Sequence, residues 1–533
     1  MYEATIDATL AELGSKRPDL LQPFMAALPG ARATVLARLW GAFGREPLPG
    51  LTARWRDAET LIVDLRNGGR LTGAEACSRQ FAPVPDDFTV AGPEGPIREP
   101  GELLAQLDLG TCAASRLVAE LDNSVVNLAL ARAANGHRDV PSALRDSVDA
   151  EQAVVDGHPQ HPCCRTRSGM SVADVLAYAP EHHPVIELAL LPVPAERWLG
   201  AGSWPEELRD GGTFLLPIHP WQRDHVLVRH PDLAPTRRTI RARPLLSLRT
   251  LAPGAGLAGR HIKTSLDVQV TNYLRTISPA EVADGPPLSE LVSAVLDKAG
   301  FGEDLGILRE LGGGAVRVDG QASASLASMV RESTDSHLGV GEVAVPLTAV
   351  HATGAAAVVG DPVHWLADLA ELLLPPVLTL LSMGVALEAH GQNTLVVMRD
   401  GRPVRILYRD LDGVRVSPRR LADCGFTLPV LAGSRACNDV GALHSKLFGA
   451  LLSGVFSELV DVLARTRSAD PAQLWATVAD VGRSVYSELP DRDDAAAFFG
   501  ATLPLKATIA MRLAGDPGRA RWTAVPNPLA LHR

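Results

Sequence analysis

The stretch EAHGQNTLVVMRDGRPVRILYRDLDG, residues 388–413, decides how the C-terminal half of the chain folds. Two short apolar runs, Thr394–Met398 and Val404–Tyr408, are joined by Arg399-Asp-Gly-Arg402, and an Asp-Gly pair between such runs is a strong hairpin signal. Because a hairpin brings its first and last residues together, the polar groups before residue 394 and after residue 408 are predicted to meet at one point.

Those polar groups have the composition of a metal site. We expect a helix end to present Glu388 and His390, Gln392–Asn393 to open the first strand, and Asp410 and Asp412 to alternate to one face of the second strand. Amide and carboxylate oxygens, completed by waters and phosphates, suit Mg²⁺. A kinase holds the metals of Mg·ATP with a similar Asn and Asp. The alternative is a polar hairpin with an Asp-capped turn.

A second stretch is strongly basic although the chain as a whole is acidic. Residues 233–266 contain no Asp or Glu and seven positive residues, Arg237, Arg238, Arg241, Arg243, Arg249, Arg260 and Lys263. Arg249 and Lys263 lie within apolar runs, where an unpaired charge is costly. A triphosphate is a natural counter-ion for both, and Arg275 follows closely enough to join them. For Arg237 and Arg238 we prefer a solvated basic face.

The third stretch is GHPQHPCCRTRSG at 157–169. His158 and His161 are possible zinc ligands, but each precedes a Pro and no HExxH spacing is present. Phosphate recognition by Arg165 and Arg167, with the imidazoles, fits the composition better because guanidinium groups match phosphate oxygens. A loop fastened by Arg–carboxylate pairs is an equal alternative.

The distribution of apolar, polar, Pro and Gly residues along the chain predicts an α+β fold in three parts. Residues 1–140 are expected to be helical, with a loop or short hairpin at 81–100; residues 141–360 form a strand-rich middle; residues 361–533 combine the hairpin with helices. Predicted strands in the middle part are Phe214–Ile218, Leu245–Leu248 and Val268–Tyr273. The stretches GAGLAG at 254–259 and GGG at 312–314 are predicted turns.

Composition excludes several classes of protein. The net charge of −10 argues against binding nucleic acid or an anionic membrane. The six cysteines are scattered, which favours buried thiols over disulfides or a zinc knot. The apolar run Leu366–Leu387 carries acids and Pro375–Pro376, and is expected to be a buried helix pair. The N-terminus lacks the pattern of a signal peptide, so we expect a cytoplasmic protein.

Taken together, these stretches resemble the IucA/IucC family of aerobactin-synthetase-like enzymes, which build siderophores without a peptide-synthetase assembly line. The resemblance runs from about residue 100 to 530 and lies in GHPQHPCCRTRSG (157–169), LPIHPWQ (216–222), LLSLRT (245–250), KTSLDVQVTNYLRTIS (263–278), EAHGQNTLVV (388–397), YRDLDG (408–413), LPLKATIAMRL (503–513) and NPLA (527–530).

The resemblance implies a cupped-hand fold of three parts and an ATP- and Mg²⁺-dependent reaction. A carboxylate, usually of citrate or a related acid, becomes an acyl-adenylate, and an amine or hydroxyl then displaces AMP. It implies ATP-binding residues His158, His161, Arg165, Arg167, Ser247, Arg249, Lys263, Arg275 and Gln392, catalytic residues Lys263, Arg275 and His390, and metal ligands Glu388, Asn393, Asp410 and Asp412. Homodimers are common in the family.

The chain differs from the family pattern at two positions, and three other functions compete with the one that the resemblance implies. Arg165 stands where the family usually has Lys, and Met170 where it has an aromatic residue, which puts the first contact and the substrates in question. The rivals are a phosphotransferase that releases ADP, a metal hydrolase built on His158 and His161, and an inactive nucleotide-binding protein.

Overall fold

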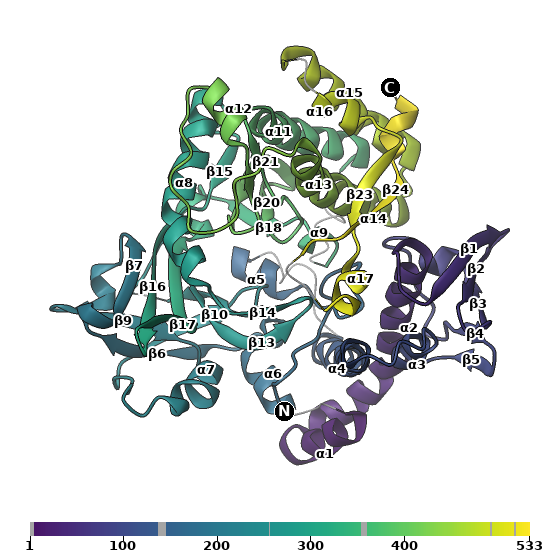
Figure 1. Cartoon of the computed structure of the whole chain (residues 1–533), viewed down its shortest axis with the longest axis horizontal. Coiled ribbons are helices and arrows are strands. Elements are labelled where there is room, and N and C mark those ends of the chain that lie inside the picture. The colour runs from purple at the N-terminus through teal and green to yellow at the C-terminus, as the bar shows by residue number, and fades with distance from the viewer. Residues whose placement is uncertain are drawn as a thin grey trace.

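The computed structural model describes residues 5–136, 145–254, 256–352, 360–490, 493–515 and 519–532. It combines helices with sheets that are mostly antiparallel, so the predicted α+β class is confirmed. Figure 1 shows three groups of elements around a common centre: N-terminal helices with a small sheet (purple), a large sheet (teal), and a mixed C-terminal group (green and yellow). The predicted division at residue 140 falls outside the described residues.

The N-terminal group contains more strand than the sequence predicted. Its helices are α1 (Ile6–Lys16), α2 (Leu21–Arg45), α3 (Pro100–Ala105) and α4 (Cys112–Asn135). Between α2 and α3 lies an antiparallel sheet of β1 (Leu51–Asp57), β2 (Thr60–Leu65), β3 (Arg70–Ala74), β4 (Val90–Gly92) and β5 (Gly95–Ile97). The helical prediction is therefore wrong for 51–74, whereas the hairpin expected in 81–100 is present. The missed signal is Asn67-Gly68, where Gly68 has φ 86°.

The middle of the chain builds a nine-stranded sheet in the order β7-β16-β17-β12-β11-β10-β6-β9-β8. The strands are β6 (Ile186–Val193), β7 (Trp198–Gly202), β8 (Arg209–Asp210), β9 (Thr213–Ile218), β10 (Thr239–Pro244), β11 (Thr250–Pro253), β12 (Arg260–Thr264), β16 (Glu310–Val318) and β17 (Gln321–Glu332). A hairpin of β13 (Leu266–Val270) and β14 (Tyr273–Arg275) projects from it toward the centre of the molecule (Figure 1).

Three local predictions in this region are corrected. Phe214–Ile218 is a strand, but Leu245–Leu248 is the turn between β10 and β11, and Val268–Tyr273 spans the turn between β13 and β14. The GGG stretch at 312–314 lies inside strand β16. A Cβ on Gly314 would stand 1.8 Å from the Trp198 ring, so glycine is there because a neighbouring side chain lies against the strand.

The C-terminal group is built on a four-stranded sheet in the order β15-β21-β20-β18. Strands β20 (Thr394–Arg399) and β21 (Arg402–Tyr408) form the predicted hairpin, with Thr394 opposite Tyr408. Their neighbours β15 (Leu305–Ile307) and β18 (Glu342–Pro346) come from before residue 360. The sheet therefore crosses the predicted boundary at 360.

Helices cover this sheet and carry the chain back to the N-terminal group. They include α5 (Ser147–Gln152), α8 (Pro279–Ala299), α11 (Pro362–Ser382), α12 (Pro418–Asp423), α13 (Val440–Ala450), α14 (Ser457–Arg467), α15 (Pro471–Glu488), α16 (Asp493–Phe498) and α17 (Thr508–Leu513). A π-helical turn, Leu451–Phe456, joins α13 to α14. Strands β23 (Thr502–Lys506) and β24 (Trp522–Pro526) pair beside them.

The apolar run that contains Pro375 and Pro376 is one continuous helix, α11, so the prediction of a helix pair is wrong. Two helical stretches, 362–382 and 440–467, have the length and apolar composition of a membrane span. In each, more than half of the apolar stretch is buried against the rest of the protein, as 67% and 61% of the residues are. Burial of this kind is what core helices show.

Two large hydrophobic cores hold the groups together. One combines α2 and α4 with the nine-stranded sheet and takes in Ile509 and Ala510 of α17. The other packs α8, α11, α13, α14 and α15 around the four-stranded sheet. The C-terminal segment therefore belongs to both cores, and the polar motifs of the sequence lie in the region between them.

Candidate active site

Lys263 and Asp410 form the charged pair at the centre of this region. Lys263 lies on β12 with a side chain only 4% exposed, and its Nζ is 3.0 Å from Asp410 Oδ1. Glu281 Oε1 is also near, 3.7 Å from the same Nζ. Burial on its own raises the pKa of Asp410, but Lys263 and Arg249 outweigh it and hold that pKa well below its ordinary value. Asp410 is therefore an anion within a cationic surrounding.

Arg249 and Arg275 supply positive charge that the protein does not neutralise. Arg249 Nη1 donates to the carbonyls of Arg275 (3.0 Å) and Thr276 (2.7 Å), and Arg275 Nη2 donates to Thr271 Oγ1 (2.9 Å). Within the described part of the chain, neither guanidinium has a carboxylate within 4 Å. Burial, followed by the charge of Arg249, lowers the pKa of Arg275 to about 10. Two cations held by neutral carbonyls leave room for an anionic ligand.

Backbone strain accompanies these residues. Asp410 has φ 69°, Leu248 between Ser247 and Arg249 has φ 71°, and Thr271 beside the arginine cluster has φ 52°. Left-handed φ is uncommon for residues other than glycine and is unfavourable for a β-branched residue such as Thr. Strain of this kind is concentrated at functional sites, where the surrounding structure enforces it.

His161 is buried and both of its ring nitrogens are engaged. Nε2 lies 2.9 Å from Asn272 Oδ1, and Nδ1 accepts a hydrogen bond from the Cys163 N–H at 2.9 Å. Nε2 therefore carries the proton and donates to Asn272. Burial lowers the pKa of His161 to about 4, so the ring is neutral. In the structure His161 fixes the loop against β13–β14, and its contact with ATP stays a prediction.

His158 remains available to a ligand. Its Nδ1 accepts the Gln160 N–H at 3.2 Å, and the residue is exposed. The two histidine rings are 6.0 Å apart, and no group of three His, Cys, Asp or Glu in the described ranges is arranged to hold a metal ion. The metal-hydrolase alternative therefore gains no support from the geometry.

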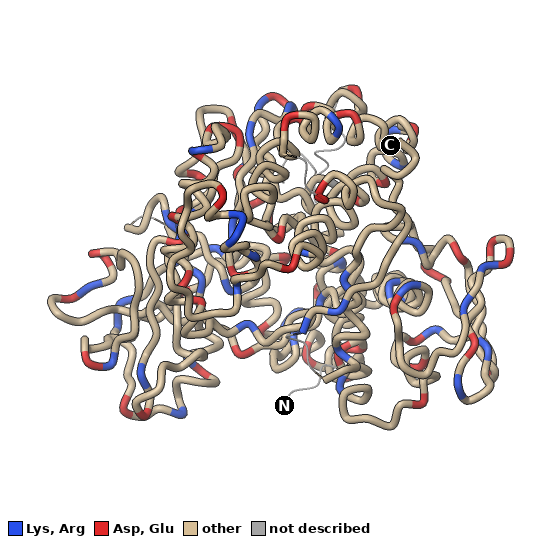
Figure 2. The backbone as a smooth tube through the Cα atoms, turned by 45° about the horizontal axis from the view of Figure 1, so that its top comes forward, with Lys and Arg blue, Asp and Glu red and all other residues tan. Residues whose placement is uncertain are grey.

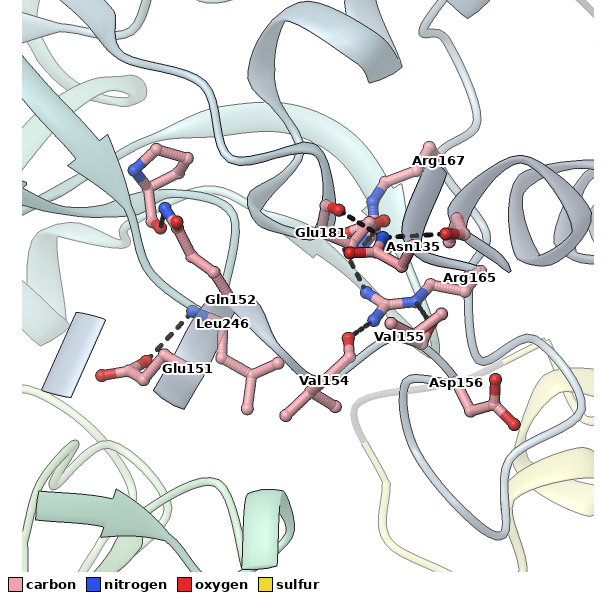
Figure 3. A network of polar contacts seen from close by, with 12 residues as sticks. Asn135, Glu151, Gln152, Val154, Val155, Asp156, Arg165, Arg167, Glu181 and Leu246 are labelled. Carbon is pink, nitrogen blue, oxygen red and sulfur yellow. Dashed lines mark hydrogen bonds and ion pairs between the residues drawn. The ribbon is translucent and has the colours of Figure 1, made fainter. Parts of the chain in front are cut away.

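Arg165 and Arg167 are both buried and both turn to Glu181 (Figure 3). Arg165 Nη1 is 3.1 Å from Glu181 Oε2 and its Nε donates to the Val155 carbonyl at 2.7 Å. Arg167 Nη2 lies 3.5 Å from Glu181 Oε1. The sequence left open whether these arginines bind phosphate or fasten the loop. Their contacts in the structure fasten the loop, and phosphate binding stays a prediction.

Glu388, a predicted metal ligand, lies between two lysines. Its Oε1 is 3.0 Å from Lys446 Nζ on α13 and 3.5 Å from Lys506 Nζ at the end of β23. Burial on its own raises the pKa of Glu388, but the two lysines lower it to about 2. Sequence reasoning missed both lysines, although Lys506 belongs to the quoted LPLK motif. Lys506 Nζ also stands 5.7 Å from the centre of the Tyr273 ring.

The ends of the hairpin meet as predicted, but in a different conformation. The Arg409 N–H donates to the Asn393 carbonyl at 3.0 Å, which places Asn393 beside Asp410. Glu388 and His390 lie in a turn after the short strand β19 (Val385–Ala386), and α11 ends earlier, at Ser382. The expectation that a helix end presents them is therefore wrong.

Asp410 and Asp412 follow β21, which ends at Tyr408, so strand alternation does not place them on one face. Asp412 is half exposed and pairs with Arg435 at 2.6 Å, whereas Asp410 pairs with Lys263. Gln392 contributes a backbone carbonyl to Arg409 Nε at 3.1 Å. Ser247 Oγ accepts the Thr250 N–H at 3.2 Å and closes the turn before Arg249.

Comparison with known proteins agrees with this arrangement. The IucA / IucC family matches residues 146–352, and a family described as ferric iron reductase FhuF-like transporter matches residues 363–520. Staphyloferrin A synthase of Staphylococcus aureus is 25% identical over 434 residues, covering 72% of this chain and 73% of that protein. D-ornithine–citrate ligase of the same organism is 23% identical over 476 residues, 74% of this chain and 72% of that one.

Two solved structures share the whole architecture. The petrobactin biosynthesis protein AsbB of Bacillus anthracis has a TM-score of 0.79 at 19% identity and covers 96% of this chain and 98% of that one. The ATP-bound aerobactin synthetase IucA of Klebsiella pneumoniae has a TM-score of 0.74 at 17% identity, with 94% and 99% covered. The fold, the site and these relatives define a synthetase of the ligase class.

Residues 146–352 match the IucA / IucC family, so the resemblance that the sequence predicted is confirmed for this part of the chain.

Proposed function

We propose that this chain uses ATP to adenylate a carboxylate of a citrate-like acid and then joins it to an amine or hydroxyl. The observation that carries the proposal is the pair of guanidinium groups of Arg249, which is buried, and Arg275, which is half-buried; in the described part of the chain neither has a carboxylate partner, and both belong to the site of the Lys263–Asp410 pair. Fixed positive groups of this kind stabilise a triphosphate and the pyrophosphate that leaves it. A relative named for joining D-ornithine to citrate, and an ATP-bound structural neighbour, support both substrates.

In the proposed first step, a carboxylate oxygen attacks the α-phosphorus of ATP and pyrophosphate leaves. Arg249, Arg275 and Lys263 neutralise the departing charge, and His158, whose pKa lies well below its ordinary value, contributes a neutral imidazole. In the second step the amine nitrogen or hydroxyl oxygen forms a bond to the acyl carbon, and the bond from that carbon to AMP breaks. Orienting the two reactants contributes about 7–11 kcal/mol at most.

The residues at the hairpin fit Mg²⁺. Asn393 and Asp410 provide the oxygen atoms that this ion prefers, and Mg²⁺ takes only one or two protein carboxylates when phosphates and waters complete its shell. When bound with the nucleotide, it supplies further compensation of phosphate charge. Asp412 is a candidate third ligand, although it pairs with Arg435, and Glu388, the fourth predicted ligand, pairs with two lysines. The kinase alternative uses the same groups but gains no support from the relatives.

The test separates adenylation from phosphorylation by its products. Purified chain is incubated with ATP, Mg²⁺, hydroxylamine and a panel of mono-, di- and tricarboxylic acids, and pyrophosphate, ADP and hydroxamate are measured. We expect pyrophosphate and hydroxamate with a citrate-like acid. Release of ADP instead, or no pyrophosphate with any acid, contradicts the proposal. A cytoplasmic location and a homodimer remain predictions, which fractionation and light scattering address.

A further inference from the structure

A cavity lies beside the proposed active site, between the N-terminal and C-terminal groups. Its volume is about 290 Å³, close to the lower limit of small-ligand pockets, which is about 300 Å³. Helix α2, helix α14, the loop at 157–160 and Thr348 line it, and Figure 1 shows α14 above α2 in this region. It shares the loop of His158 with the active site and contains none of the proposed phosphate-binding arginines.

Two opposite charges face this cavity without neutralising each other. Glu458 on α14 accepts a hydrogen bond from the Thr348 hydroxyl, and Arg38 on α2 donates to the Asp156 carbonyl at 3.1 Å. Within the described ranges neither forms an ion pair within 4 Å, although the charge of Arg38 is close enough to affect the pKa of Glu458. Burial raises that pKa to about 8 in spite of the charge of Arg38, so the carboxyl group is largely protonated at neutral pH and ionises when a further cation is placed beside it.

Several other charged groups of the lining already form ion pairs. Arg132 is 2.6 Å from Asp156, and Arg465 is 2.7 Å from Asp461. Arg45 donates to the Ser78 carbonyl, and within the described ranges neither Arg45 nor Asp86 forms an ion pair within 4 Å. Among the unpaired groups, Glu458 on α14 and Arg38 on α2 are the two of opposite sign for which the charge of one affects the pKa of the other.

The cavity is also connected to the catalytic segments. The Thr348 N–H donates to the Gly391 carbonyl at 3.2 Å, and Gly391 follows His390 directly. Gln160, which also lines the cavity, bonds through Nε2 to the Ser453 carbonyl in the π-helical turn at 3.1 Å, while its backbone N–H donates to His158. A molecule held here is adjacent to both His158 and the turn of residues 388–393.

We propose that this cavity binds the zwitterionic end of an amino-acid acceptor, with its α-carboxylate at Arg38 and its α-ammonium at Glu458. The inference rests on the proposed function and names the class of acceptor for the second step. A second nucleophile on the same molecule, an amine or hydroxyl of the side chain, then reaches the activated acid. Its N or O forms the new bond to the acyl carbon, AMP leaves with the electrons of the broken C–O bond, and the nucleophile's proton passes to solvent.

The experiment compares two acceptors and two variants in the full-length chain. The acceptors are ornithine and 1,4-diaminobutane, which lacks the carboxylate. We expect the kcat/KM for ornithine to exceed that for the diamine about tenfold or more, the value of one charge-assisted hydrogen bond. Glu458→Gln and Arg38→Gln should each raise the KM for ornithine by a similar factor, and Arg38→Gln should leave the KM for the diamine unchanged.

Three controls separate the possible failures. Acid-dependent exchange of pyrophosphate into ATP needs no acceptor and should be equal in wild type and variants; its absence from wild type contradicts the proposed function itself. Asp480→Asn, at an exposed residue of α15 that pairs with Arg483 away from the cavity lining, should leave the KM for ornithine unchanged. Calorimetric titration of ornithine into the protein tests binding without turnover. Equal use of both acceptors, KM changes below twofold in both cavity variants, or no ornithine binding overturns the inference.

Discussion

Glu151 and Arg409 form a buried ion pair that joins two parts of the proposed active site. Their side chains are 1% and 3% exposed, and Arg409 Nη2 lies 2.8 Å from Glu151 Oε2. The same carboxylate oxygen accepts the Leu246 N–H at 3.0 Å. Arg409 precedes Asp410, and Leu246 precedes the turn that carries Arg249. Helix α5 therefore fixes the anionic and cationic sides of the site relative to each other.

Removing Glu151 should cost both stability and activity. Glu151→Ala leaves a buried guanidinium without a counter-ion, which costs about 3–5 kcal/mol of unfolding free energy. Denaturant unfolding measures this loss. Asp64→Ala breaks the Asp64–Arg70 pair, whose side chains are 30% and 59% exposed, and should cost about 1 kcal/mol or less. Equal losses in the two variants would show that the buried pair does not organise the site.

The Lys263–Asp410 pair should be required for chemistry and not for folding. Lys263→Met keeps the length of the side chain and removes the charge, and Asp410→Asn keeps the shape of the carboxyl group. Each should reduce acid-dependent pyrophosphate release by about 10²–10³, as the loss of a preorganised electrostatic contact does. Circular dichroism should be unchanged. Lys298→Met, at an exposed lysine, serves as the control, and near-normal release in either active-site variant means that the site is misplaced.

Local sequence signals predicted the features that depend on neighbouring residues. The Asp-Gly turn predicted the β20–β21 hairpin, and the acid-free stretch 233–266 singled out Arg249 and Lys263, which the fold brings close to Asp410. The Asn67-Gly68 pair is a local turn signal of the same kind, and it lies between the paired strands β2 and β3. These predictions succeed because backbone conformation and burial at such positions follow from a few adjacent residues.

Long-range pairing is what the sequence did not show. Glu388 meets Lys446 and Lys506, which lie 58 and 118 residues further along the chain. Arg165 pairs with Glu181, and from composition alone any carboxylate of the chain was an equal candidate for that partner. Whether a buried arginine pairs with a carboxylate of the protein or with a ligand depends on which side chains the tertiary fold brings next to it. The spacing of residues in the sequence does not show this.

His158 and His161 are three residues apart but should respond differently to substitution. His161→Ala leaves Asn272 and the Cys163 N–H without a partner in the interior, at a cost of about 1–3 kcal/mol for each group. His158→Ala should change the unfolding free energy by less than about 0.5 kcal/mol and raise the KM for ATP. Thermal unfolding and ATP titration of both variants check the contrast, and a large stability loss in His158→Ala would contradict the assignment.

Buried His219 should make the protein sensitive to mild acid. Burial lowers its pKa to about 3, and its Nδ1 accepts the Trp221 N–H at 3.2 Å. Because the unfolded chain titrates near its ordinary pKa of about 6.5, it takes up the proton first, and stability is lost as pH falls below that value by about 1.4 kcal/mol per pH unit.

The comparison that isolates His219 is His219→Gln, which removes the titrating group and can still accept the Trp221 N–H. Other buried acids titrate in the same range, but they are common to both proteins and cancel in the difference. Between pH 7 and 5, the unfolding free energy of wild type should fall relative to the variant. Parallel pH profiles would mean that His219 ionises in the folded protein.

Asn393 and Glu388, two of the predicted metal ligands, should respond differently to substitution in a Mg²⁺ titration. Asn393→Ala removes an oxygen ligand, so the Mg²⁺ concentration for half-maximal pyrophosphate release should rise about 10-fold or more. Glu388→Gln should leave that concentration within twofold and lower the maximal rate, because Lys446 and Lys506 lose the carboxylate that positions them. Lys446→Met should reproduce the second behaviour. If Glu388→Gln instead raises the Mg²⁺ requirement more than Asn393→Ala does, Glu388 is a metal ligand in the working enzyme, and its pairing with the two lysines belongs only to the resting state.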